Sequence, residues 1–186
     1  MERKILLLAG SAGGFSVILN ILKSLERPVR IPVVVIVHRN PKYASSIEET
    51  LSKVMLQKIK TADDKENIEN GTIYFAPAGY HLLVEPDYSF SLDISEPVQY
   101  SRPSIDVTFE SAAEIYQQNC TAILFSGANQ DGARGLLMIK KYGGKTFVQD
   151  PLSAEVPVMP EAAIQLNAHD KILSIQEIKD YIMQLT

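Results

Sequence analysis

Short runs of aliphatic residues alternate along the chain with stretches whose apolar residues recur at helical spacing. Residues 4–10 (KILLLAG) form a strand-like run, and residues 15–25 after it place their apolar side chains on one face of a helix. The run at 32–37 (PVVVIV) is continuously apolar and β-branched, as is typical of a strand buried on both faces. Because helices that link successive strands make those strands parallel, the chain is predicted to be an α/β protein, with a doubly wound, mostly parallel sheet flanked by helices.

The same alternation continues to the C-terminal end, with one interruption. Further strands are expected at residues 71–77, 121–125, 145–149 and 171–175, and further helices at residues 45–54, 102–117, 131–144, 159–166 and 176–185. The interruption, HLLVEPDYSFSLDI at 81–94, holds two short strands around a turn and predicts an inserted antiparallel hairpin. No repeat, linker or low-complexity segment divides the chain, so residues 1–186 are predicted to form a single domain.

Three of the expected helices carry start signals. Ser46 is followed by Glu49 at the spacing of a capping box. Ser104 is expected to be the N-cap of its helix, with Asp106 in the first turn, where the helix dipole stabilises a carboxylate. Pro160 falls in the first turn of the helix at 159–166, where its missing N–H is not needed.

Composition excludes several classes of protein. The formal net charge of −4 over 186 residues disfavours a nucleic-acid scaffold. The single cysteine, Cys120, cannot form an intramolecular disulfide and is expected to be a small buried residue of a strand. The first residues lead directly into a strand without the apolar core of a signal peptide, and no apolar run is long enough for a membrane span. We therefore expect a cytoplasmic protein that neither binds nucleic acid nor inserts in a membrane.

A serine, a histidine and an aspartate each follow a predicted strand. Ser11 follows the first strand, His38 the second, and Asp131 lies in the loop after residues 121–125. In open parallel sheets, ligands bind outside the carboxyl ends of the strands, so these three side chains are expected at one edge of the sheet. Together they are the inventory of a Ser-His-Asp hydrolase, which needs a hydroxyl nucleophile, an imidazole base and a carboxylate to orient that base.

The residues around Ser11 favour a nucleophile without excluding simpler roles. The sequence Ala9-Gly10-Ser11-Ala12-Gly13 approaches the G-x-S-x-G pattern of a strained strand-to-helix turn, with Ala in the first place. Ser11 is also compatible with an N-cap of the next helix, whereas neither glycine-rich phosphate-binding motif is met. His38 is compatible with an ordinary strand-end histidine and Asp131 with a cap of the helix after it. These separate explanations do not require the three residues to lie at one edge of the sheet, whereas a catalytic site does.

The remaining histidines carry weaker signals. His81 is compatible both with lining the site and with simply starting the hairpin, and His169 is expected in a surface turn. The chain has neither an H-E-x-x-H motif nor paired cysteines. No metal and no other cofactor is therefore predicted.

The ordered segments AGSAGG, VIVHRNP, IYFAPAGYHLLV, RPSIDVTFESAA, FSGANQDGARGL, TFVQDP and MPEAAI span nearly the whole sequence. With these segments the chain resembles the catalytic domain of the CheB-type chemotaxis protein-glutamate methylesterases. The resemblance implies hydrolysis of γ-glutamyl methyl esters on the cytoplasmic helices of chemotaxis receptors, giving glutamate and methanol, and deamidation of receptor glutamines in some members. It implies Ser11 as nucleophile, His38 as general base and Asp131 as orienting carboxylate.

The same resemblance suggests further site residues. Ala12, Gly13, Ala128 and Asn129 are expected to line the site or its oxyanion hole, and His81, Arg102, Met159 and Glu161 are candidate substrate contacts. Ala128 stands where the family often has Met, and it still supplies a backbone N–H. Asn129 replaces a glycine, and asparagine tolerates positive φ better than other side chains do. Glu161 replaces an arginine, which reverses a charge that an anionic receptor surface would meet.

Many members of the family also carry an N-terminal receiver domain, and the predicted strands here begin near residue 4. Either the sequence is a part of a longer protein, or the domain acts without such control, or regulation comes from a separate receiver or scaffold protein.

Three functions remain open from sequence: a receptor-modifying esterase, a receptor-binding module with little turnover, and a general hydrolase of small esters. A receptor esterase requires Ser11 Oγ within or near hydrogen-bond reach of His38, and His38 facing Asp131.

Overall fold

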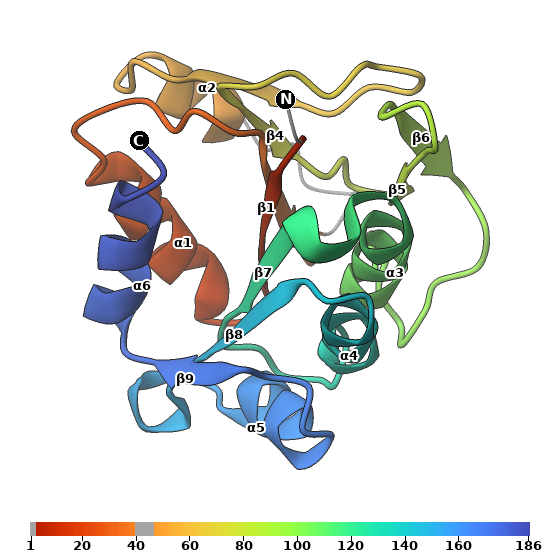
Figure 1. Ribbon diagram of the computed structural model, residues 1–186, viewed down its shortest axis with the longest axis vertical. Coiled ribbons are helices and arrows are strands. Elements are labelled where there is room, and N and C mark those ends of the chain that lie inside the picture. The colour runs from red at the N-terminus through yellow and green to blue at the C-terminus, as the bar shows by residue number, and fades with distance from the viewer. Residues whose placement is uncertain (1–2, 40–46) are drawn as a thin grey trace.

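A seven-stranded sheet, all of whose strand pairs are parallel, forms the centre of the computed structural model, which describes residues 3–39 and 47–186 (Figure 1). The strand order is β3-β4-β2-β1-β7-β8-β9. The strands are β1 (Ile5–Gly10), β2 (Val33–Val37), β3 (Lys58–Thr61), β4 (Thr72–Phe75), β7 (Cys120–Leu124), β8 (Lys145–Gln149) and β9 (Lys171–Leu173). The predicted doubly wound parallel sheet is confirmed.

Helices cover both faces of this sheet (Figure 1). The helices α1 (Gly14–Lys23) and α6 (Ile175–Met183) lie on one face, and α3 (Ile105–Tyr116) and α4 (Ala133–Lys141) lie on the other. The shorter α5 (Val158–Gln165) contacts α4, and α2 (Ile47–Ser52) contacts β3. Two short 3-10 helices occupy Gln117–Asn119 and Pro151–Ser153.

The side-chain alternation of β1 divides the core into two layers. Ile5, Leu7 and Ala9 belong to the cluster that contains α3 and α4 residues, whereas Leu6 and Leu8 belong to the cluster that contains α1 and α6 residues. All five side chains are fully buried. Burial on both faces explains why the strand is aliphatic at every one of these positions.

The predicted hairpin is a separate antiparallel sheet beside α3. It consists of β5 (His81–Val84) and β6 (Phe90–Asp93). Thr108 on α3 donates a hydrogen bond from Oγ1 to the Leu82 carbonyl at 2.7 Å, which ties the hairpin to the helix. The chain then returns from β6 to α3 through residues 94–104, and this return segment contributes to the site described below.

The structure differs from the sequence predictions in a few places. The edge strand β3 was not expected, because its sequence KIKT buries only the side chain of Ile59 and carries little apolar signal. The capping box expected at Ser46 lies outside the described residues. Pro160 is in the first turn of α5 as predicted. Across the described ranges, no helix combines the length and apolar character that a membrane span requires.

Candidate active site

Strand register places Ser11 beside His38. Gly10 is paired with Val37 in the parallel ladder of β1 and β2, so the next residue of each strand lies at the same level. The core cluster on the α3 and α4 face contains Ile5, Leu7 and Ala9 of β1 and Val34 and Ile36 of β2. Ser11 continues the alternation of the β1 residues, and His38 continues that of the β2 residues. The period of two therefore directs both side chains towards this face at the carboxyl edge of the sheet.

The turn after β1 is held close to its neighbours. Gly13, at φ 76°, is the N-cap of α1, and a Cβ there would come within 2.6 Å of Glu155 Cβ. A Cβ on Gly14 would lie 2.4 Å from the carbonyl oxygen of Ser126, so only glycine fits. The Ser11 N–H donates to that same carbonyl at 2.9 Å. The interpretation of Ser11 as the N-cap of α1 is wrong, because the helix begins two residues beyond the position that it requires.

The backbone N–H groups of this turn are available to a ligand. Among the described residues, the N–H groups of Ala12 and Gly13 have no hydrogen-bond acceptor. They stand at the N-terminus of α1, where the helix dipole adds a partial positive charge. Such donors suit the oxyanion of a tetrahedral intermediate.

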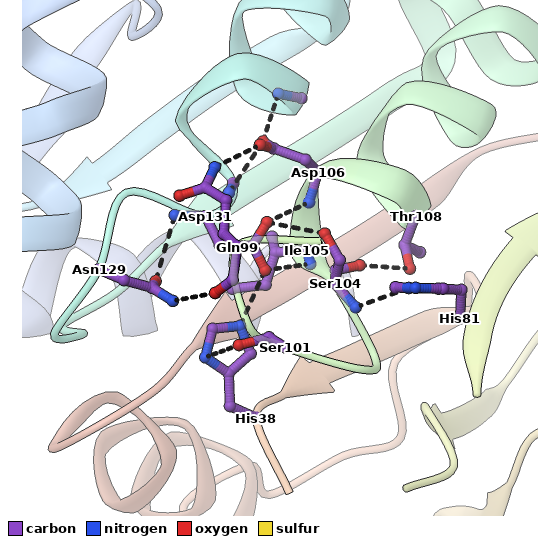
Figure 2. Close-up of polar contacts among 12 residues, drawn as sticks. His38, His81, Gln99, Ser101, Ser104, Ile105, Asp106, Thr108, Asn129 and Asp131 are labelled. Carbon is purple, nitrogen blue, oxygen red and sulfur yellow. Dashed lines mark hydrogen bonds and ion pairs between the residues drawn. The ribbon is translucent and has the colours of Figure 1, made fainter. Parts of the chain in front are cut away.

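His38 lies between a carboxylate and a hydroxyl (Figure 2). Its Nε2 is 2.8 Å from Asp131 Oδ2, and its Nδ1 is 3.2 Å from Ser101 Oγ. The side chain of Asp131 is fully buried, whereas that of His38 is 15 % exposed. Because an ionised carboxylate can only accept a hydrogen bond, Nε2 carries the hydrogen atom and donates a hydrogen bond to Asp131. The lone pair of the neutral ring is therefore on Nδ1. The basic nitrogen of His38 is therefore Nδ1.

The Asp131 carboxylate caps α3 rather than the helix that follows it. Oδ2 accepts the Ile105 N–H at 2.7 Å, and Oδ1 accepts the Asp106 N–H at 2.9 Å and the Ser104 hydroxyl at 2.8 Å. Burial acts to raise the pKa of Asp131, but these hydrogen bonds and the one from His38 outweigh it and hold the pKa below its ordinary value. Asp131 therefore remains ionised and fixed in place beside His38.

The expectation that Ser104 caps α3 is corrected by the same contacts. Ser104 occupies the N-cap position, but its side chain makes no cap hydrogen bond and donates to Asp131 instead. The alternative interpretation of Asp131 as the cap of α4 is also wrong, since the N-cap of α4 is Gly132 without a side-chain bond.

The carboxylate of Asp106, in the first turn of α3, accepts hydrogen bonds from the start of α4. Its Oδ1 accepts the N–H groups of Gly132 at 2.9 Å and Gly135 at 2.8 Å, and its Oδ2 accepts Gln99 Nε2 at 3.1 Å. Burial raises the pKa of Asp106 to about 6 despite these bonds. Asp131, just before α4, thus binds the start of α3, and Asp106 of α3 binds the start of α4. These reciprocal bonds fix Asp131 relative to both helices.

The loop before Asp131 presents Ala128 to solvent and turns Asn129 inward. Asn129 Oδ1 accepts the Asp131 N–H at 3.2 Å, and its Nδ2 donates to the Gln99 carbonyl at 3.4 Å. The residue does not have a positive φ, so the conformational reason expected for asparagine at this position is wrong. Its amide instead connects the loop to the segment that precedes α3.

Two of the candidate substrate contacts are buried. The Met159 side chain packs under the loop, because a Cβ on Gly127 would meet its Cε at 2.4 Å. His81 is also buried, with Nδ1 accepting the Ser104 N–H at 3.1 Å and Nε2 3.1 Å from the Glu96 carbonyl oxygen. Both side chains support the site from within and do not face solvent.

The other two candidates are accessible. Arg102 is half-buried and donates from Nη1 to the carbonyls of Ile94 and Ser95 at 2.7 and 2.9 Å. Glu161 is exposed in the first turn of α5. A cleft of about 370 Å³ adjoins His38, and it is lined by His38, Arg39, Gly79, Pro97, Tyr100, Ser101 and Arg102.

One predicted contact is formed and another is not. His38 faces Asp131 as required, but within the described part of the chain the Ser11 hydroxyl makes no hydrogen bond, and Ser101 occupies the Nδ1 of His38. Sequence reasoning missed Ser101 and Gln99 altogether, and it found Ser104 and Asp106 only as helix-start residues. The spacing of Ser104 and Asp106 is a helix-start signal, whereas nothing in the sequence marks Ser101 and Gln99.

No three His, Cys, Asp or Glu side chains of residues 3–39 and 47–186 are grouped as metal ligands.

Comparison with known proteins gives consistent matches. A family model described as CheB methylesterase matches residues 6–182. A Leptospira interrogans protein is 41% identical over 185 residues, which are 100% of this chain and 96% of that one. A Symbiobacterium thermophilum protein named protein-glutamate methylesterase/protein-glutamine glutaminase is 29% identical over 182 residues, and the chain spans 50% of its length. The crystal structure of the Thermotoga maritima CheB methylesterase catalytic domain matches with a TM-score of 0.91 at 29% identity, and the match covers 100% of both chains.

Proposed function

Because the chain belongs to the CheB methylesterase family, we propose that it is a serine esterase acting on γ-glutamyl methyl esters of chemotaxis receptors. The observation that carries the proposal is the His38–Asp131 pair, 2.8 Å apart, at the strand end next to Ser11. The products would be glutamate and methanol. The name of the Symbiobacterium relative also includes a glutaminase, so the same site is proposed to deamidate receptor glutamines, whose acyl carbon occupies the same position.

The first half of the reaction forms an acyl-enzyme. Ser11 Oγ attacks the ester carbonyl carbon while its proton passes to His38 Nδ1, and the carbonyl oxygen becomes an oxyanion. The N–H groups of Ala12 and Gly13, with backbone donors of the Ala128–Asn129 loop, would stabilise that oxyanion. The tetrahedral intermediate then expels the methoxy group, which takes the proton from His38 and leaves as methanol.

The second half releases the acid. A water molecule gives a proton to His38 Nδ1 and attacks the acyl carbon, and the collapse of this intermediate returns the proton to Ser11 Oγ and frees glutamate. Asp131 stabilises the imidazolium in both halves through Nε2 and is not itself protonated. The proposed cycle uses no metal and no cofactor.

The proposed partners follow from the substrate. We propose that the protein acts in the cytoplasm on methylated helices of chemotaxis receptors. Of the candidate contacts, Arg102 lines the cleft beside His38 and Glu161 is exposed in the first turn of α5, so both are retained as proposed substrate-binding residues. Neither membrane insertion nor nucleic-acid binding is part of the proposal.

Methanol release from a methylated receptor fragment tests the proposal. The wild-type protein should release methanol, and Ser11→Ala should lower kcat by three or more powers of ten, about what loss of a triad nucleophile costs. Ser24→Ala, whose hydroxyl bonds the Ile21 carbonyl at the far end of α1, is the matched control and should retain activity.

Two other outcomes would contradict a receptor esterase. Receptor binding without methanol release would identify the protein as a binding module of the same fold. Hydrolysis of a small aryl ester without activity on the receptor fragment would identify it as a general hydrolase of small esters.

A further inference from the structure

The basic nitrogen of His38 is already occupied. Ser101 Oγ lies 3.2 Å from Nδ1, while Nε2 is committed to Asp131. Since Nδ1 carries a lone pair in this tautomer, the Ser101 hydroxyl donates to it. A ring nitrogen has one lone pair in the plane of the ring, so Nδ1 accepts one good hydrogen bond at a time. Ser11 therefore needs the acceptor that Ser101 uses in this structure.

Ser101 is held at this position by a defined turn. Val98 and Ser101 exchange backbone hydrogen bonds of 3.2 and 2.9 Å, and the two residues between them, Gln99 and Tyr100, have φ values of 47° and 64°. Non-glycine residues rarely adopt such values, so contacts elsewhere must specify the turn. Gln99 supplies them, with its side chain on Asp106 and its carbonyl on Asn129.

The segments on either side of the turn are also anchored. The Glu96 carbonyl is bonded to His81, and the carbonyls of Ile94 and Ser95 accept Arg102 Nη1. At the tip of the turn, Tyr100 is fully exposed on the edge of the cleft beside His38. The segment thus delivers the Ser101 hydroxyl to His38 from the side that faces the cleft.

We infer that Ser101 restrains the base: its hydroxyl occupies His38 Nδ1 in the resting protein and must release it before Ser11 can be deprotonated. The inference rests on the proposed function, because it takes Ser11 as the nucleophile. Asp131 alone is sufficient to fix the tautomer of His38, so the Ser101 bond is not needed to orient the base. Its effect is competition, and its removal makes Ser11 more reactive.

The rate at which a fluorophosphonate modifies Ser11 measures this competition without a receptor substrate. Ser101→Ala should react about two- to tenfold faster than the wild type, which corresponds to the release of one neutral hydrogen bond. Ser101→Thr keeps the hydroxyl and should react at the wild-type rate. Ser95→Ala is the control on the same segment, because the hydroxyl of the exposed Ser95 bonds Asp93 and not the site. Thermal unfolding of each variant checks that the fold is retained.

The outcomes separate this inference from the function on which it rests. Labelling of Ser11 at equal rates in wild type and Ser101→Ala, or slower labelling in Ser101→Ala, overturns the inference alone. Equal acceleration in Ser101→Thr overturns it as well, since the hydroxyl would then be irrelevant. If none of the four proteins is labelled at Ser11, the proposed function fails and the inference fails with it.

Discussion

The two sides of the candidate site are built differently. On the base side, His38, Asp131 and Asp106 are joined to the starts of α3 and α4, and each of the two carboxylates accepts at least three hydrogen bonds. On the nucleophile side, Ala12 and Ala128 are exposed, Ser11 is half-exposed, and its hydroxyl has no partner in the described part of the chain. The first side is complete within the fold, whereas the second leaves its polar groups for a substrate.

This difference assigns stability and chemistry to different residues. A buried carboxylate that caps a helix and orients a base serves folding and catalysis at once, so a substitution there should impair both. A half-exposed hydroxyl without a partner serves only the reaction. Variants on the base side should therefore lose both activity and stability, whereas variants of the Ser11 hydroxyl should lose activity alone.

The largest combined loss of activity and stability is expected at Asp131. The two carboxylate oxygens of Asp131 accept hydrogen bonds from His38, Ile105, Asp106 and Ser104. In Asp131→Asn, an NH₂ group replaces one of these oxygens and faces a hydrogen-bond donor. The tautomer of His38 is then no longer fixed. We expect kcat to fall by about 10⁴-fold, with a clear loss of unfolding free energy. Methanol release and urea unfolding measure the two effects.

Asp180→Asn, on the exposed face of α6, is the matched control and should change neither quantity. An Asp131→Asn protein within tenfold of wild-type kcat would refute the base-side account.

Asp106 should govern part of the pH dependence of stability. Its pKa of about 6 in the folded protein lies above the ordinary value of 3.8, so the folded state binds the proton more tightly than the unfolded state does. The stability that this proton contributes is complete below about pH 4 and is lost as pH rises through 6, by about 3 kcal/mol at most. Asp131, with a lowered pKa, acts in the opposite sense and loses its contribution as pH falls.

Asp106→Asn removes the first of these two trends. Urea unfolding between pH 4 and 7 should show the variant gaining stability relative to wild type as pH rises, by up to about 3 kcal/mol. A difference between the two proteins that stays constant over this range would show that Asp106 does not titrate there.

A smaller effect is expected where the two sides meet. Asn129 joins the Asp131 N–H to the Gln99 carbonyl through bonds of 3.2 and 3.4 Å, which are long. Asn129→Ala should lower the unfolding free energy by about 1 kcal/mol and kcat by less than tenfold. A loss as large as that of Asp131→Asn would mean that the boundary between the two sides is misplaced.

The smallest change in stability is expected at Ser11. Removing its hydroxyl breaks no hydrogen bond of the described structure, so Ser11→Ala should unfold within about 0.5 kcal/mol of wild type while its turnover is lost. Thermal and urea unfolding of Ser11→Ala and Asp131→Asn, measured side by side, give the comparison its sharpest form. Equal destabilisation by the two substitutions would contradict it.

The two sides also differ in how much their sequence revealed. Ser11 and His38 were found because each directly follows an aliphatic strand, and the ends of neighbouring parallel strands meet at one edge. The cap of α3 by Asp131 was missed, because the partner is 25 residues away in sequence and only the placement of α3 against α4 brings it there. The turn that carries Ser101 was missed because Gln99 and Tyr100 adopt φ values that their residue types do not favour.

The most direct test of the account is the site at which a fluorophosphonate attaches. After reaction and tryptic digestion, tandem mass spectrometry should place the adduct on Ser11, within the peptide of residues 5–23. The adduct should be absent in Ser11→Ala and should form far more slowly in Asp131→Asn. An adduct on Ser101, the hydroxyl that contacts His38 in this structure, or an unmodified wild-type protein would contradict Ser11 as the nucleophile.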